Sequence, residues 1–140
     1  MEENLKQLLL KDLCARLPYG VQGITSEGEI SPLLTIGEAD WDILTSLNYR
    51  IVKHGWKPYL RSMSSMTEEE RLELSKLTDD KFKFYLYTRK PEIICYEKYN
   101  YLEGLKVLDW LNAHHFDYRG LIPMGLALEA PEGMYNTKTE

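Results

Sequence analysis

Residue types that bind anions gather in one part of this sequence, Ile43–Thr67. This window contains no aspartate or glutamate, although the chain holds 22 acidic residues. The cationic and aromatic side chains that we single out in it are Arg50, Lys53, Trp56, Lys57, Tyr59 and Arg61. Guanidinium and ammonium groups hold phosphate or carboxylate, and an aromatic face stacks on a planar ring. We predict that these residues, joined by Arg119, bind an anionic, nucleotide-like small molecule; the alternative is a solvated strand and loop whose cations pair with acids such as Glu68–Glu70.

A second place with reactive side chains is His114–Asp117, because imidazole and carboxylate groups ligate metals and transfer protons. Neighbours on a helix point about 100° apart, so the two histidines share one metal only if the helix ends between them. No HExxH motif or distant Cys/His set completes a zinc site. We therefore expect no metal and no cofactor. Histidines at the end of a helix instead favour its negative dipole, while Asp117 pairs with Arg119 or caps the next turn.

No complete catalytic motif occurs elsewhere in the sequence. Ser62, Ser64 and Ser65 lack the GxSxG or SxxK frame of a nucleophile and precede a predicted helix, where serines serve as cap and turn residues. No glycine-rich phosphate loop is present. Hence we predict no catalytic residue and no enzyme activity, and a metal-dependent hydrolase at the histidine pair remains an alternative.

Charge and hydropathy narrow the classes of partner. The net charge of −5 disfavours a general attraction to nucleic acid or anionic lipid but does not exclude a local patch, so a nucleic-acid-binding module that uses the same cations is the first alternative, ahead of the hydrolase. No apolar run approaches the roughly 20 residues that cross a bilayer, and Lys11 and Asp12 interrupt the tract Leu8–Leu10. Cys14 and Cys95 have no CxxC spacing, so we expect reduced, buried thiols in a cytoplasmic protein.

Three segments have the signals of helices. Leucines at positions 5, 9, 13 and 17 recur at helical spacing and predict a helix over Glu3–Leu17. Thr67 and Glu70 form a capping-box pattern ahead of a helix over Glu68–Leu77. The last long helix is predicted over Tyr99–His115, and apolar residues on two flanks, Leu108 among them, predict that it is largely buried.

Short apolar segments between turn residues predict strands. The predicted strands are Val21–Thr25, Ile30–Ile36, Ile43–Leu47, Tyr49–Lys53, and a hairpin of Phe82–Tyr87 with Glu92–Tyr96. Pro32 has no amide hydrogen to donate, so its strand belongs at the edge of a sheet or at a bulge. Met124–Glu129 is predicted to form one further helical turn.

These elements predict an α+β fold with a small antiparallel sheet or a partly open barrel. The sheet is predicted to be antiparallel because its strands lack the intervening helices of a parallel sheet. An N-terminal helix and a C-terminal helix are expected to pack on one side of it. Trp110 and the leucines of the last helix are expected to form the core with the first helix. Residues 1–135 make one globular domain, and residues 136–140 form a frayed tail.

Three stretches carry a resemblance to a known group of proteins: Leu8–Val21, Lys57–Glu70 and Asp109–Tyr135. They resemble short proteins of Bacteroides-group gut bacteria and of their phages and prophages, a family with no established activity. The resemblance implies a phage or prophage accessory protein inside a bacterial cell. With the cationic window, it leads to the hypothesis of a binding protein that sequesters a nucleotide-type signal or blocks a host defence protein. The many tyrosines and tryptophans also predict a homo-oligomer.

Overall fold

The structure is a computed structural model that describes residues 2–33, 43–86, 91–95, 98 and 100–135. Its helices are α1 (Glu3–Arg16), α2 (Ile43–His54), α3 (Glu68–Leu77) and α4 (Tyr101–Ala113), with short 3-10 turns at Leu17–Tyr19 and Met63–Ser65. Its strands are β1 (Gln22–Ile24), β2 (Ile30–Pro32), β3 (Lys57–Leu60), β4 (Phe82–Leu86), β5 (Pro91–Cys95) and β6 (Leu128–Glu129). The predicted α+β class is confirmed, and the described strands do not close into a barrel. The expected fraying of residues 136–140 lies outside the described residues, as do the last positions of the strand predicted to end at Ile36.

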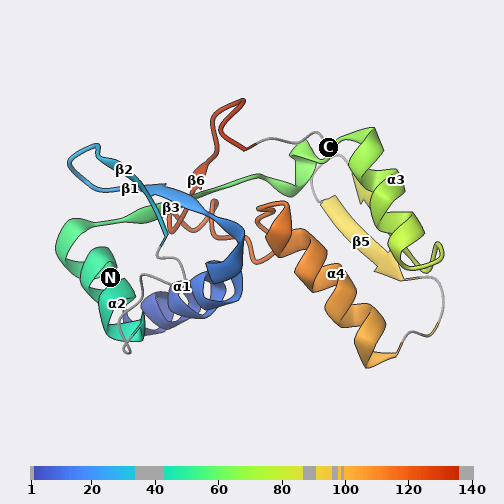
Figure 1. The fold of residues 1–140 in the computed structure, drawn as a ribbon, viewed down its shortest axis with the longest axis horizontal. Helices are drawn as coiled ribbons and strands as arrows, with labels where there is room; N and C mark the ends of the chain where they lie inside the picture. The colour runs from blue at the N-terminus through green and yellow to red at the C-terminus, as the bar shows by residue number, and fades with distance from the viewer. Residues whose placement is uncertain (1, 34–42, 87–90, 96–97, 99, 136–140) are drawn as a thin grey trace.

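The larger sheet has the strand order β2-β1-β3-β6 (Figure 1). β1 pairs antiparallel with β2 and β3, whereas β3 pairs parallel with β6, so the sheet is mixed. Pro32 lies in β2, an edge strand, as predicted. Beyond β3, the Arg61 amide donates to the His115 carbonyl at 2.7 Å and the Asp117 amide donates to the Arg61 carbonyl at 2.8 Å. These bonds fasten the end of α4 to the sheet.

The predicted hairpin and the predicted helix over Glu68–Leu77 are confirmed. β4 and β5 form a two-stranded antiparallel sheet from Phe82 opposite Cys95 to Leu86 opposite Pro91. At the start of α3, the Glu70 amide donates to the Thr67 hydroxyl at 3.1 Å, and the Thr67 amide donates to the Glu70 carboxylate at 3.0 Å. Both signals are local, since the capping box and the aromatic strands need no distant partner to form.

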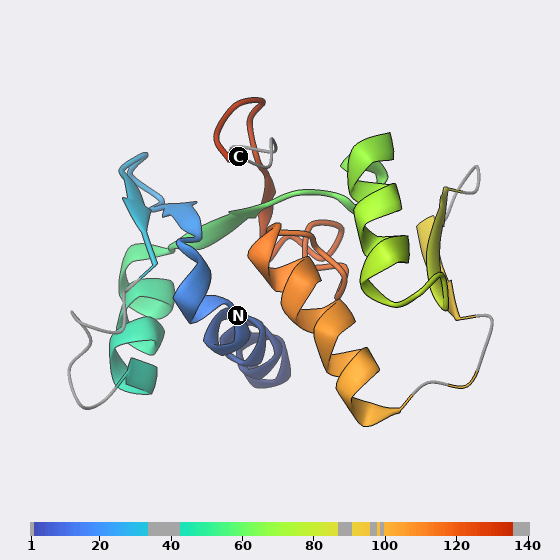
Figure 2. The same cartoon turned by 45° about the vertical axis from the view of Figure 1, so that its right-hand side comes forward.

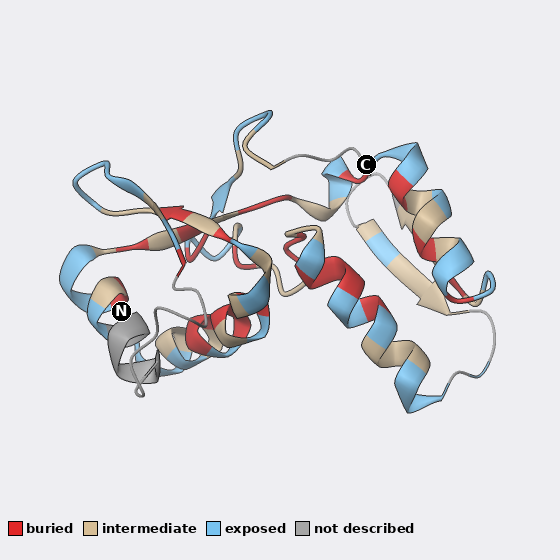
Figure 3. Ribbon diagram, in the orientation of Figure 1, coloured by how far each residue is buried: buried red, intermediate tan, exposed pale blue. Residues whose placement is uncertain are grey.

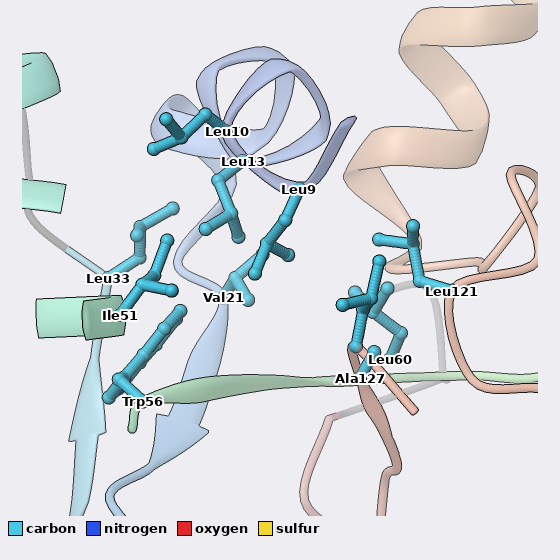
Figure 4. Close-up of a cluster of buried hydrophobic side chains, with 11 residues drawn as sticks. Leu9, Leu10, Leu13, Val21, Leu33, Ile51, Trp56, Leu60, Leu121 and Ala127 are labelled. Atoms are coloured by element: carbon cyan, nitrogen blue, oxygen red, sulfur yellow. The ribbon is translucent and has the colours of Figure 1, made fainter. Parts of the chain in front are cut away.

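Two clusters of buried apolar side chains lie in separate halves of the molecule (Figures 1 and 2). The first cluster, shown in Figure 4, consists of Leu9, Leu10, Leu13, Val21, Leu33, Ile51, Trp56, Leu60, Leu121, Leu126 and Ala127. The second consists of Met66, Leu74, Phe82, Phe84, Val107, Trp110, Leu111 and Phe116. The expectation that Trp110 packs with the first helix is therefore wrong. Trp110 belongs to the cluster of α3 and the hairpin, because that side of α4 faces them.

The two strands predicted between Ile43 and Lys53 are wrong, since a single helix, α2, occupies this segment. Isoleucine, valine and tyrosine suggested strands, yet the buried Ile51 is followed by three exposed residues, Val52–His54, a run that the alternation of a strand does not give. Gly55 follows the last residue of α2 and has a φ of +61°, a conformation that glycine adopts without steric cost. The chain then enters β3, a strand that the sequence did not predict.

Two further predictions about the C-terminal part are wrong. Leu102 and Leu108 of α4 are exposed, so this helix is not largely buried (Figure 3). Its inner side is apolar as expected, with Val107 and Leu111 in the second cluster. Leu128–Glu129 is the short strand β6 rather than part of a further helical turn, because β3 offers it an edge to pair with.

Candidate functional site

Arg61 of the predicted site is bound by a carboxylate. Its guanidinium donates to both oxygens of Glu70 at 2.7 Å, and the side chains are 9% and 4% exposed. The same guanidinium lies over the Phe116 ring at 4.2 Å. Burial works against the charged form of Glu70, but hydrogen bonds from Arg61 and Thr67 outweigh it and hold the carboxyl pKa below its ordinary value. Arg61 therefore joins the end of β3 to the start of α3.

Arg119 is also paired, with an acid of α1. Its Nε donates to Asp12 of α1 at 3.1 Å, and the fully buried Arg16 donates to the same carboxylate at 2.7 Å. Arg16 reaches further and donates to the Phe116 carbonyl at 2.7 Å. Asp12 thus collects two cations, and Arg119 does not join the window residues in one pocket.

His114 and His115 turn to different neighbours. His114 stacks on the Trp110 ring with centroids 4.2 Å apart, and its Nδ1 lies 2.8 Å from the Trp110 carbonyl. His115 takes a φ of +64° and stacks on Tyr135 at 3.8 Å. Burial, and then the charges of Arg16, Arg61 and His114, lower its pKa to about 4.

Asp117 caps the following turn. Its two carboxylate oxygens accept from the amides of Leu121 and Ile122 at 2.8 and 2.9 Å. The capping interpretation is thus confirmed, and the pair with Arg119 is wrong. Within the described ranges, no three His, Cys, Asp or Glu side chains gather in a way that could hold a metal ion. The geometry gives the metal-dependent hydrolase alternative no support.

Arg50 and Trp56 are brought together in a depression between the β1–β2 hairpin and α2. The depression has a volume of about 320 Å³, and the residues around it are Thr25, Glu29, Ser31, Tyr49, Arg50, His54 and Trp56. The Arg50 guanidinium lies over the Trp56 ring at 5.9 Å and donates to the Pro32 carbonyl at 2.8 Å. In the part of the chain that the structure describes, no carboxylate pairs with Arg50. This depression is the candidate site, because it holds a cation, the exposed ring of Tyr49 and hydroxyl groups together.

The remaining predicted residues do not line this depression. Lys53 is exposed, and Lys57 and Tyr59 are half-buried. The Tyr59 carbonyl accepts from the Tyr135 hydroxyl at 2.7 Å, so its strand is held by the C-terminal segment. Of the seven predicted site residues, Arg50 and Trp56 are the pair that the fold places in one recess.

Thr25, Glu29 and Ser31 were missed as site residues. They come from the β1–β2 hairpin, which lies beside α2 only after the chain has folded. Nothing in their spacing relates them to Arg50. Tyr49 and His54 were closer to detection, because both lie inside the cationic window; their rings meet edge to face at 5.2 Å.

No family model, curated protein or solved structure matches this sequence. Among the described helices, none has both the length and the apolar character that crossing a bilayer requires.

Proposed function

We propose that this protein is a non-enzymatic binding protein whose ligand is a small anion with a planar ring, of nucleotide type, held in the depression between β1–β2 and α2. The observation that supports this most is Arg50, which lines the depression over Trp56 without a carboxylate partner among the described residues. A guanidinium without an ion-pair partner has donors available for phosphate, and such charge-assisted hydrogen bonds are about twice as strong as neutral ones.

The rest of the depression suits a ligand with donors as well as an anion. Glu29 contributes a carboxylate, which accepts from N–H groups such as those of a nucleobase. Thr25 and Ser31 contribute hydroxyls, and Tyr49 contributes a ring. We propose Arg50 as the phosphate contact and Glu29 as the contact to the ring edge. We no longer propose Arg61 and Arg119 as ligand contacts, because each forms an ion pair with a carboxylate.

The resemblance to proteins of Bacteroides-group bacteria and their phages suggests a biological setting for such binding. We propose that the protein is a phage or prophage accessory protein that acts inside the bacterial cell. It would sequester a nucleotide-derived signal of host immunity, or else block a host defence protein. Genes for other anti-defence proteins beside its own gene would support this setting.

Thermal melting in the presence of single ligands tests the binding proposal. The probes are inorganic phosphate, nucleoside mono- and diphosphates and cyclic nucleotides. A ligand present at 100 times its dissociation constant adds about 2.7 kcal/mol to the free energy of unfolding, so a true ligand raises the melting temperature. Replacement of Arg50 by glutamine is expected to weaken that ligand about 10- to 100-fold, the value of a hydrogen bond to a charged group.

Arg71→Gln is the matched control. Arg71 lies on α3, beside a second depression in the other half of the molecule, so its loss leaves the binding unchanged. If none of the probes shifts the melting temperature, or if R50Q binds as tightly as the unaltered chain, the proposal is wrong.

The nucleic-acid alternative predicts a different dependence on salt. Arg50, Lys53 and Lys57 would contact successive phosphates, and each contact contributes a slope of about −0.9 for duplex DNA or −0.7 for single strands in a plot of log K against log salt. Titrations of a labelled oligonucleotide at several salt concentrations measure this slope. Binding of an oligonucleotide with such a slope, but of no mononucleotide, would favour the alternative.

A further inference from the structure

One side of α4 is apolar and exposed. Tyr101, Leu102 and Leu108 are 77%, 67% and 42% exposed, and the half-buried Leu105 lies between them. Residues three and four apart are neighbours on a helix, so these four side chains form one continuous stripe. Single exposed leucines are ordinary, whereas a contiguous apolar stripe marks an interaction surface. In Figure 2, α4 lies between α1 and α3, and its N-terminal end extends beyond both of them.

Two opposite charges accompany the stripe. Asp109 follows Leu105 by one helical turn and is exposed among the leucines, and Lys106 lies at the edge of the stripe. In the described part of the chain, neither of them forms an ion pair. A purely apolar partner would strip Asp109 of water without replacing its hydrogen bonds, which is costly for a carboxylate. The partner must therefore present a cation at this point.

We propose that the partner is a second copy of this chain, docked through α4 in an antiparallel orientation. A two-fold axis close to Val107 and Leu108 places Lys106 of each copy opposite Asp109 of the other. The same register sets Leu102 of one copy against Ala113 of the other, a bulky residue over a small one. Two-fold dimers are the most frequent homo-oligomers, and their interfaces are self-complementary in this way.

The charges select the antiparallel orientation. In a parallel pair, Lys106 would face Lys106 and Asp109 would face Asp109, so like charges would repel at both positions. A single polar position in an apolar helix seam is known to fix register and orientation. Asp109 has that role here, because only one register neutralises it.

The proposed interface does not depend on the proposed ligand site. α4 lies in the half of the molecule opposite to the β1–β2 hairpin and α2, so a dimer leaves the depression open (Figure 1). Failure of one proposal leaves the other standing, because oligomeric state and ligand binding are measured separately.

Sedimentation equilibrium on the purified chain and on charge variants tests the proposal. The unaltered chain is expected to dimerise. K106E places two acids against each other and D109K places two lysines, so each single variant is expected to weaken dimerisation at least about tenfold. The doubly exchanged K106E/D109K restores opposite charges across the interface and is expected to dimerise again.

Leu72→Asp is the control for a general effect of surface charge. Leu72 is 54% exposed on α3, outside the proposed interface, so L72D is expected to leave the dimer intact. Circular dichroism and melting temperature check that each variant is folded, which is expected because all three positions are exposed. A monomeric unaltered chain, a double exchange no more dimeric than the single ones, or a dimer lost in L72D would overturn the proposal.

Discussion

Arg61 is held by a carboxylate, a ring and a backbone carbonyl at once. Glu70 accepts two hydrogen bonds from it, Phe116 lies beneath its guanidinium, and the Ser65 carbonyl accepts at 3.3 Å. Removing one member of a buried ion pair leaves an uncompensated charge and costs about 3–5 kcal/mol. Arg61→Gln is therefore expected to lower the free energy of unfolding by that amount, measured by urea denaturation.

The exposed pair of Arg71 and Glu68 supplies the comparison for this prediction. Its charges are in water, where an ion pair contributes about 0–1 kcal/mol. R71Q should therefore have nearly the free energy of unfolding of the unaltered chain. The double variant R61Q/E70Q should lose less free energy of unfolding than the two single variants added together. Equal losses in R61Q and R71Q would show that the burial of Arg61 has no energetic consequence.

His115 makes the free energy of unfolding depend on pH between the pKa of this histidine in the folded chain and its pKa in the unfolded chain. The ordinary pKa is 6.5 and burial lowers it to about 4 in the folded state, so between these values the unfolded chain binds more protons. The free energy of unfolding therefore falls as pH drops from about 6.5 to about 4, by at most about 1.4 kcal/mol per pH unit, and this contribution is fully present above pH 6.5. Denaturation at a series of pH values measures it.

His115→Asn is the variant for the same measurement. Asparagine tolerates the positive φ of this position better than most residues and does not titrate, so the slope above pH 4.5 should disappear. The carboxyl of Glu70 has a lowered pKa and acts below its ordinary value of 4.5, outside this part of the range. A slope that persists in H115N would assign the dependence to another group.

At the scale of elements, signals confined to a few residues predicted the structure best. The capping box of Thr67 and Glu70 fixed the start of α3, and the leucine spacing of Glu3–Leu17 predicted α1 to within a residue. α2 was missed because its β-branched and aromatic residues favour strands in isolation, and packing of Ile51 in the first cluster overrides that preference. The sequence of α4 alone likewise does not show which of its sides is buried, because that is decided by contact with α3 and the hairpin.

Helix α3 offers a matched test of burial within one element. Leu74 is fully buried in the second cluster, whereas Leu72 is largely exposed. Replacing a buried leucine by alanine costs about 2–5 kcal/mol, because it leaves a cavity, and replacing an exposed one is usually within about 0.5 kcal/mol. L74A and L72A compared by urea denaturation should differ accordingly. Similar values for the two would mean that the side of α3 that packs inward is misassigned.

At the scale of the whole molecule, long-range pairing decided which cations stayed available. The sequence predicted seven ligand-binding residues from charge and aromatic content alone. Arg61 is instead paired with Glu70, one of the acids that the alternative interpretation named, whereas Arg119 is paired with Asp12, 107 residues away along the chain, and no local pattern reveals that partner. The pairing of Arg50 with Trp56 could be predicted from the sequence, because the two lie six positions apart in a window without acids.

The two clusters are joined by buried polar contacts, so we expect them to unfold together. Arg16 of the first half donates to the Phe116 carbonyl of the second. Trp56 and Trp110 report separately on the two clusters, in a background where Trp41 is replaced by phenylalanine. Urea transitions followed in W56F and in W110F should coincide apart from the stability change that each substitution causes. With Arg16→Gln added, the two transitions should separate; coincidence there would mean that Arg16 does not couple the halves.

The first cluster draws Leu121, Leu126 and Ala127 from beyond α4, although most of its residues come before Arg61. During translation, α1 and the β1–β2 hairpin leave the ribosome long before these three residues are made. Until position 127 emerges, Leu9, Leu13 and their neighbours have no apolar cover on that side. The nascent chain therefore exposes an apolar surface for most of its synthesis. A chaperone that binds exposed leucines could bind the chain throughout this stage.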